Sequence, residues 1–173
     1  MGQYFRPCII GKDKKTVLKW MSSHEYDNGL KLMEHSYLLN KFVGAFESLL
    51  VGKPQRVVWA GDYANKNKKL GTNFYNRCTD ENNVKPKATI VKERFIINHT
   101  KKLFVDKTKV QNVDGWSIHP LPLLTCESNG RGGGDFYRED KQGLVGSWAR
   151  DRISVEAIKP KGYTEIVFDL IEN

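Results

Sequence analysis

The chain has 173 residues, of which 39% are hydrophobic and 28% are charged, with a net charge of +8. This composition excludes an intrinsically disordered chain and predicts one folded domain with a substantial core. No apolar run is long enough to span a membrane, and the first eleven residues lack the features of a signal peptide. The three cysteines are widely spaced and odd in number, which favours reduced thiols and a cytoplasmic location.

The basic charge is the first indication of a partner. A net charge of +8 and a pI near 9.3 suit a polyanion, because basic surface attracts phosphates and releases their counterions. Most of the lysines lie in predicted turns, such as 12–15, 66–69 and 101–102. A generic basic surface therefore explains the charge equally well.

The first predicted elements are two short strands, residues 4–10 and 16–21, which the turn G-K-D-K-K joins into a hairpin. Residues 29–51 then repeat apolar side chains at helical spacing, until a glycine and a proline end the pattern. This stretch is the one principal helical region that we expect. Residues 56–60 (R-V-V-W-A) form a continuous apolar run, which predicts a central strand.

The second half of the chain predicts further strands. Residues 94–97 and 103–106 flank N-H-T-K-K as a second hairpin. Two prolines in 118–126 indicate an edge or irregular extended segment. Three strand-like stretches follow, at 143–149, 153–158 and 163–171. We therefore expect an α+β fold in a single domain, residues 1–173, with a largely antiparallel sheet.

Five motifs carry a resemblance to a known group of proteins. They are M-G-Q-Y-F at 1–5, V-V-W-A-G-D-Y-A at 57–64, I-I-N-H-T-K-K at 96–102, I-H-P-L-P-L-L-T at 118–125 and N-G-R-G-G-G-D-F at 129–136. Together they resemble a family of uncharacterised phage and gut-bacterial proteins. The resemblance implies a small, phage-encoded cytoplasmic protein, in a setting where nucleic-acid handling and antagonism of host defence are common.

The glycine-rich stretch within the last motif is a candidate anion site. Gly132, Gly133 and Gly134 allow successive backbone N–H groups to point into one concavity, and Arg131 and Arg138 would add bidentate hydrogen bonds to a phosphate. The run matches neither common nucleotide-binding glycine motif, and a flexible surface loop is the alternative. The predicted ligand-binding residues are Arg131, Gly132, Gly133, Gly134, Asp135, Arg138, Trp116, Tyr137 and His119.

Carboxylates and one histidine form a second candidate site. Asp62, Asp135 and Asp151 each follow a predicted strand. Asp62 and Asp151 are each the last residue of the pattern W-A-x-D, at 59–62 and 148–151. If the three converged, they would hold Mg²⁺ for phosphoester hydrolysis; capping and charge neutralisation are the alternative roles. His119 is the candidate general acid or base, with a packing role as its alternative.

Aromatic residues interleave with these basic and glycine residues. Trp116 and Tyr137 lie in polar segments and suit stacking on bases, whereas Trp59 and Trp148 have apolar neighbours and are expected in the core.

The function that we expect is therefore non-enzymatic binding of a phosphate-bearing ligand, a nucleotide or a nucleic acid, without a cofactor. The first alternative is a metal-dependent phosphoesterase or nuclease that uses Mg²⁺, the three aspartates and His119. The second alternative is a protein–protein inhibitor without a small-molecule ligand, in which the glycine-rich loop is merely mobile. The resemblance to phage proteins adds a host defence protein as a candidate partner.

Overall fold

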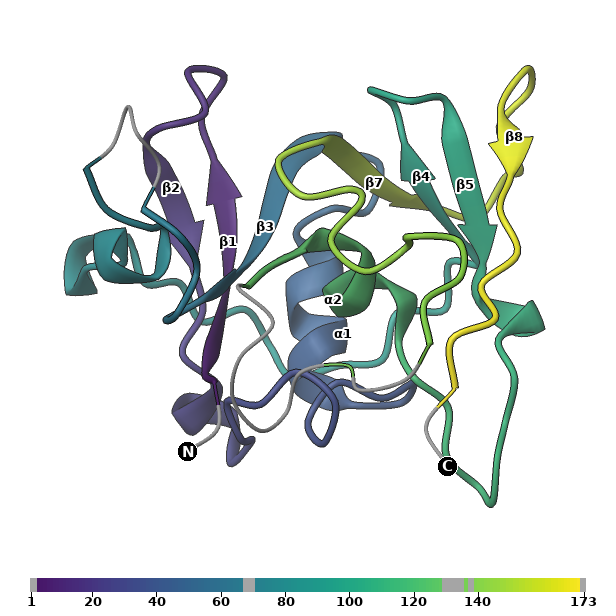
Figure 1. The fold of residues 1–173 in the computed structure, drawn as a ribbon, viewed down its shortest axis with the longest axis horizontal. Helices are drawn as coiled ribbons and strands as arrows, with labels where there is room; N and C mark the ends of the chain where they lie inside the picture. Colours follow the sequence, from purple (N-terminus) through teal and green to yellow (C-terminus); the bar gives the residue numbers. More distant parts are fainter. Residues whose placement is uncertain (1–2, 67–70, 129–135, 137–138, 172–173) are drawn as a thin grey trace.

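The computed structural model describes residues 3–66, 71–128, 136 and 139–171. The strands form one twisted sheet with two helices against it (Figure 1). The strands are β1 (Phe5–Ile10), β2 (Val17–Trp20), β3 (Gln55–Gly61), β4 (Phe95–Asn98), β5 (Leu103–Asp106), β6 (Cys126–Glu127), β7 (Arg152–Glu156) and β8 (Thr164–Glu165).

The sheet has the strand order β2-β1-β3-β7-β4-β5-β8, and β6 pairs with β3 away from this path. Its pairs are antiparallel except for β3 with β6 and β5 with β8. Both predicted hairpins are confirmed, and so is the interior position of the R-V-V-W-A strand. The α+β class with a largely antiparallel sheet is therefore correct.

The helical region is shorter than the predicted 29–51. The helix α1 spans Lys41–Ser48, and turns precede it. Asn40 sets the start, because its side-chain oxygen accepts hydrogen bonds from the N–H groups of Phe42 (2.9 Å) and Val43 (3.1 Å). The remaining short helical turns are η1 (Ser23–Tyr26), η2 (Tyr75–Arg77), η3 (Asp80–Asn82) and η4 (Lys107–Lys109).

The prediction of an extended segment at 118–126 was wrong, because Pro120–Thr125 form a second helix, α2. Its prolines occupy the first turn, where the missing N–H has no intrahelical partner and the fixed φ suits a helix. His119 caps this turn, since its Nδ1 accepts the N–H of Leu121 at 3.1 Å. None of the helices in the described ranges is long and apolar enough to cross a membrane.

Two cores lie on the two faces of β3. Val57 and Trp59 face the large core, which α1 and α2 cover, whereas Val58 and Ala60 face a smaller core. Burial on both faces explains why β3 reads as a continuous apolar run. The smaller core is closed by Phe74.

The last third of the chain contains less strand than predicted. Residues 145–150 form turns, although the sequence indicated a strand at 143–149. Leu144 and Trp148 are nevertheless buried in the large core, so their apolar character reflects packing and not strand pairing. Within 163–171, only Thr164–Glu165 pairs with a neighbouring strand, β5. The stretch at 153–158 is confirmed as β7.

Candidate anion-binding site

A cavity of about 510 Å³ opens where β1 ends and β3 begins. Three basic residues line it, namely Lys12, Arg56 and Arg152, and none of the described residues that line it carries a carboxylate. The other lining residues are mostly apolar: Ile9, Ile10, Gly11, Leu18, Pro54 and Gln55. We call this hollow the cationic pocket. It combines positive charge with apolar surface.

The sheet register places the two arginines together. Arg56 of β3 pairs with Ile10 of β1 on one side and with Arg152 of β7 on the other. Residues directly opposite on neighbouring strands share one face of the sheet, so the two arginine side chains leave adjacent positions of that face. Like charges directly opposite each other on neighbouring strands are destabilising. The pairing of Arg56 with Arg152 therefore lowers the stability of the folded protein.

No acidic side chain among the described residues compensates this charge. Lys12, Arg56 and Arg152 take part in none of the ion pairs of the described chain. Arg56 donates from Nη1 to the carbonyl oxygen of Arg150 at 3.0 Å. Its Nε is buried and has no hydrogen-bond partner in the part of the chain that the structure describes. A buried donor left in this way costs about 1–3 kcal/mol, and the positive charge of the pocket is left without a counter-charge from the described residues.

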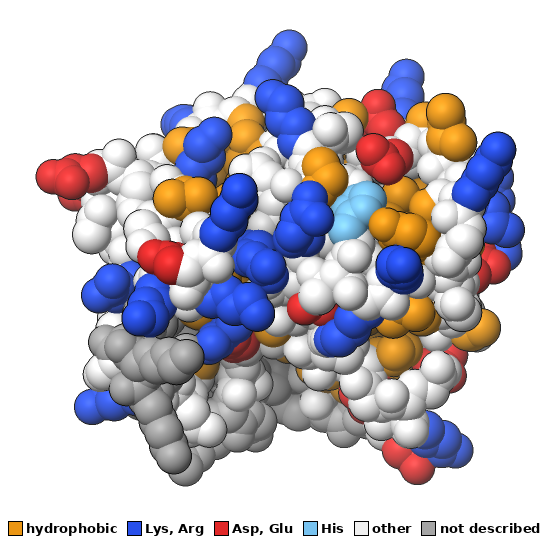
Figure 2. Space-filling model, turned by 90° about the horizontal axis from the view of Figure 1, so that it is seen from above, with side chains coloured by type: hydrophobic (Ala, Val, Ile, Leu, Met, Phe, Trp, Pro, Cys, Tyr) orange, Lys and Arg blue, Asp and Glu red, His pale blue; other side chains and the backbone are white. Residues whose placement is uncertain are grey.

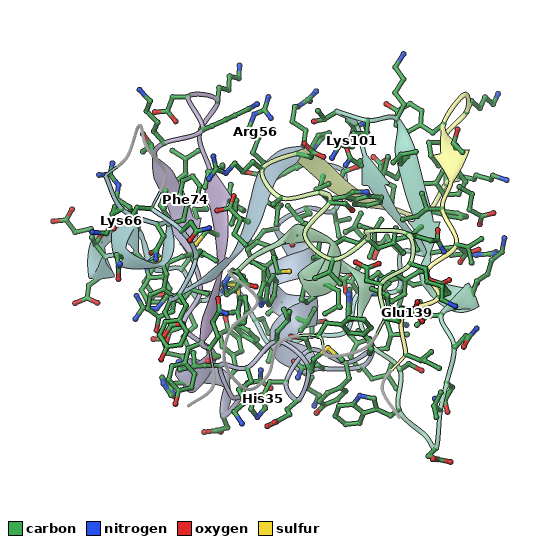
Figure 3. All side chains as sticks on the ribbon, viewed as in Figure 1. His35, Arg56, Lys66, Phe74, Lys101 and Glu139 are labelled. Atoms are coloured by element: carbon green, nitrogen blue, oxygen red, sulfur yellow. The ribbon has the colours of Figure 1, made fainter. Side chains whose placement is uncertain are left out.

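Further basic residues surround the pocket at the same end of the sheet. The N–H of His99 donates to the carbonyl oxygen of Arg152 at 2.8 Å, which fixes the β4–β5 turn beside the start of β7. Lys101, in that turn, forms an ion pair with Asp151 at 3.0 Å. Arg56 and Lys101 lie along the same edge in Figure 3, and Figure 2 shows lysine and arginine side chains gathered across this face.

Most of the glycine-rich site predicted from sequence lies outside the described residues. This applies to Arg131, Gly132, Gly133, Gly134, Asp135, Tyr137 and Arg138. Their role as an anion nest stays a prediction.

Asp62 and Asp151 do not converge. The N–H of Val57 donates to the carbonyl oxygen of Asp151, so Asp151 lies beside the start of β3. Asp62 lies five residues further along, which corresponds to about 17 Å of strand. Its Oδ1 accepts the N–H of Tyr4 at 3.0 Å, a structural contact. In the described ranges, no three residues of the His, Cys, Asp and Glu types lie close enough together to hold a metal ion.

His119 is buried, and both of its ring nitrogens are engaged. Nδ1 accepts the N–H of Leu121, so the proton of the neutral ring lies on Nε2, which donates to Glu47 Oε1 at 2.8 Å. Glu47 Oε2 accepts a hydrogen bond from Lys107 Nζ at 2.7 Å. Burial by itself raises the pKa of the Glu47 carboxyl, but His119 and Lys107 outweigh it and hold that pKa below its ordinary value. His119 thus joins α1 to α2, and its position favours the packing role over acid–base chemistry.

The aromatic candidates divide as follows. Trp59 and Trp148 are buried in the large core, as predicted. Trp116 is half-buried and packs against Tyr37, with ring centroids 4.6 Å apart. One part of its surface is therefore already covered by another ring of the protein.

Sequence reasoning missed the three residues of the cationic pocket. Arg56 was visible as a charge at the head of an apolar strand, and Lys12 as part of the first hairpin turn. Nothing in the sequence indicated that Arg152, 96 residues after Arg56, would pair with it.

Comparison with known proteins found no matching family model, no matching curated protein and no matching solved structure. The resemblance to phage and gut-bacterial proteins therefore stays a prediction.

Proposed function

We propose that this protein binds a phosphate-bearing ligand in the cationic pocket. The observation that carries the proposal is the cross-strand pair of Arg56 and Arg152, which faces a cavity without an opposing carboxylate. Guanidinium groups bind phosphate oxygens through paired hydrogen bonds, and such charge-assisted bonds are about twice as strong as neutral ones. The apolar residues of the same cavity offer a surface for the organic part of the ligand.

Isothermal titration calorimetry with inorganic tripolyphosphate tests the proposal. Arg56→Gln and Arg152→Gln should each weaken binding about tenfold or more, because each removes a charge-assisted contact worth roughly 1.5–3 kcal/mol. The matched control is Lys87→Gln, since Lys87 is exposed and belongs to none of the described ion pairs. Its affinity should equal that of the parent protein.

Thermal unfolding separates a binding defect from a folding defect. Arg152→Gln removes one of two adjacent like charges, so its Tm without ligand should stay the same or rise. Arg56→Gln also loses the hydrogen bond from Nη1 to the carbonyl oxygen of Arg150, so Arg152→Gln is the variant that this comparison uses. Weaker binding together with an unchanged or higher Tm supports a ligand site. Equal tripolyphosphate affinity in the parent and both arginine variants would refute it.

A further inference from the structure

The charge of the whole chain is concentrated at one edge of the sheet. Five segments meet there: 11–16, 53–56, 99–102, 150–152 and 158–162. They contain eleven lysines and arginines and only two aspartates, a net charge of +9, whereas the whole chain has +8. The rest of the molecule is therefore close to neutral. We call these five segments the basic edge.

Backbone contacts make the basic edge continuous. Turn 11–16 is closed by the hydrogen bond from the N–H of Gly11 to the carbonyl oxygen of Thr16, and it follows directly on Ile10, the neighbour of Arg56. Arg152 is joined to the next turn through its N–H, which donates to Thr100 Oγ1 at 2.9 Å. The N–H of Thr164 then donates to the carbonyl oxygen of Lys102, and the loop before β8 rises beside the β4–β5 turn (Figure 1).

The two aspartates of the edge are already engaged by the protein. Asp151 pairs with Lys101 and accepts a hydrogen bond from Asn98 at 2.8 Å. Asp13 accepts hydrogen bonds from the hydroxyl and the N–H of Thr16 and from the N–H of Lys15, which lowers its pKa to about 2. Of the eleven basic residues, Lys101 pairs with Asp151 and Arg150 with Glu127, and the other nine form none of the described ion pairs.

The edge is longer than a nucleotide. It crosses the seven strands of the main path of the sheet. With neighbouring strands about 4.8 Å apart, it spans about 29 Å. With the 3.4 Å rise per phosphate of one helically stacked strand, this length faces at most roughly eight phosphates, and an extended strand places fewer along it. A row of cations of this length can contact several successive phosphates of a polyanion, more than a single nucleotide carries.

Exposed apolar and aromatic groups lie among the cations. Leu18 lines the cationic pocket and is 52% exposed, and Ile158 is 81% exposed at the far end of the edge. Between them, the partly exposed rings of His99 and Tyr163 meet edge to face, with centroids 5.7 Å apart. Unpaired bases present ring faces to such groups, whereas a duplex presents mainly phosphates.

We propose that the ligand of the cationic pocket is single-stranded nucleic acid, bound along the whole basic edge. This inference rests on the proposed phosphate-binding function and extends it from one pocket to a polymer track. The phosphates lie on the lysines and arginines, and the bases contact the apolar and ring groups between them.

Fluorescence anisotropy with thymidine oligonucleotides of 3, 5, 10 and 20 residues tests the track. Affinity should rise steeply up to at most about eight residues, the number that the edge can face, and only slightly beyond. A 20-base-pair duplex should bind more weakly than the single strand of 20 residues. A uridine oligonucleotide of equal length determines whether DNA or RNA is preferred, and tight binding of either one supports the proposal.

A matched pair of triple variants locates the track. Lys102, Lys159 and Lys161 lie on the basic edge but outside the cationic pocket, and together they are changed to glutamine. The control changes Lys41, Lys85 and Lys87, which are exposed. Lys41 begins α1, and its carbonyl oxygen accepts the N–H of Thr89, close to the other two lysines.

The edge variant should lose about tenfold or more in affinity for the 20-residue oligonucleotide, and its salt slope should fall by about 2, because each single-strand phosphate contact contributes about 0.7. Its affinity for tripolyphosphate should be unchanged, and the control should bind like the parent protein.

If oligonucleotide length and the edge variant have no effect while Arg56→Gln still weakens tripolyphosphate binding, the track is refuted and the pocket stands. If the duplex or polyglutamate binds as tightly as the single strand, the track is also refuted. If Arg56→Gln changes neither ligand, the pocket itself is refuted.

Discussion

Glu47→Gln should destabilise the protein strongly, although glutamine has nearly the same shape. Glu47 is 3% exposed, and its two oxygens accept hydrogen bonds from His119 and Lys107. The side chain of Lys107 is only 10% exposed, so the variant leaves an ammonium group buried without a counter-charge. Breaking a buried ion pair by removing one partner costs about 3–5 kcal/mol. For a chain of this size, each kcal/mol lowers Tm by about 2–4 °C, so we expect a decrease of roughly 6–20 °C.

Urea unfolding at pH 7 and scanning calorimetry measure this effect. The control is Glu34→Gln, which removes the exposed i,i+3 ion pair with Lys31 and should change the free energy of unfolding by less than about 1 kcal/mol. The pKa of Glu47 is lower in the folded protein than in the unfolded chain. Its contribution is therefore complete above its ordinary pKa and disappears as the pH falls through the folded value. The difference between parent and variant should shrink at low pH. A loss below about 1 kcal/mol at pH 7 would refute the argument.

Two further predictions concern other contacts. The pKa of Asp106 is about 2, chiefly because the Arg94 side chain donates to it, with a smaller contribution from Thr108. The stabilisation from Asp106 is therefore complete above its ordinary pKa near 4 and disappears as the pH falls towards 2. Urea midpoints of the parent protein should decrease over this range, and Asp106→Asn should remove that part of the decrease; an identical pH dependence would contradict the assignment. Gly44→Ala places a Cβ 2.0 Å from the carbonyl oxygen of Thr89. The overpacking cost of about 1–3 kcal/mol should exceed the gain of about 1 kcal/mol in helix propensity, so urea unfolding should show a net loss of stability, and a gain would disprove the close contact.

The sequence predicts those elements of the fold whose signal is local. Residues 56–60 form a continuous apolar run, and two short apolar runs flank N-H-T-K-K, so β3 and the β4–β5 hairpin could be identified. The helix α2 could not be, because its two prolines are equally compatible with an extended segment and with a first helical turn. At 143–149 the apolar residues indicated a strand, but they are buried from a series of turns.

The candidate site depends on long-range topology, which local patterns do not encode. The lysines of the turns at 12–15 and 101–102 were visible one by one. Their common position follows from β7, which lies between β3 and β4 although it comes after both in the chain. The sequence does not reveal this crossover, so it does not fix where the N-terminal hairpin lies relative to the β4–β5 hairpin. From the sequence alone, the basic turns could therefore lie together or be spread over the whole surface.

Glu47 and Lys107 have charged partners of opposite sign, whereas Arg56 and Arg152 have none among the described residues. We use this difference to assign a structural role to the first pair and to propose a ligand-binding role for the second. Glu47 is buried and Lys107 largely covered, but each meets an oppositely charged partner, so the molecule loses stability when either one is removed. Arg56 and Arg152 have the reverse arrangement, since each adjoins a like charge and neither has a carboxylate partner among the described residues. Selection for stability alone would replace one of them, because a neutral residue at either position removes repulsion. Under the proposed function, an anion from outside the chain would turn this repulsion into attraction.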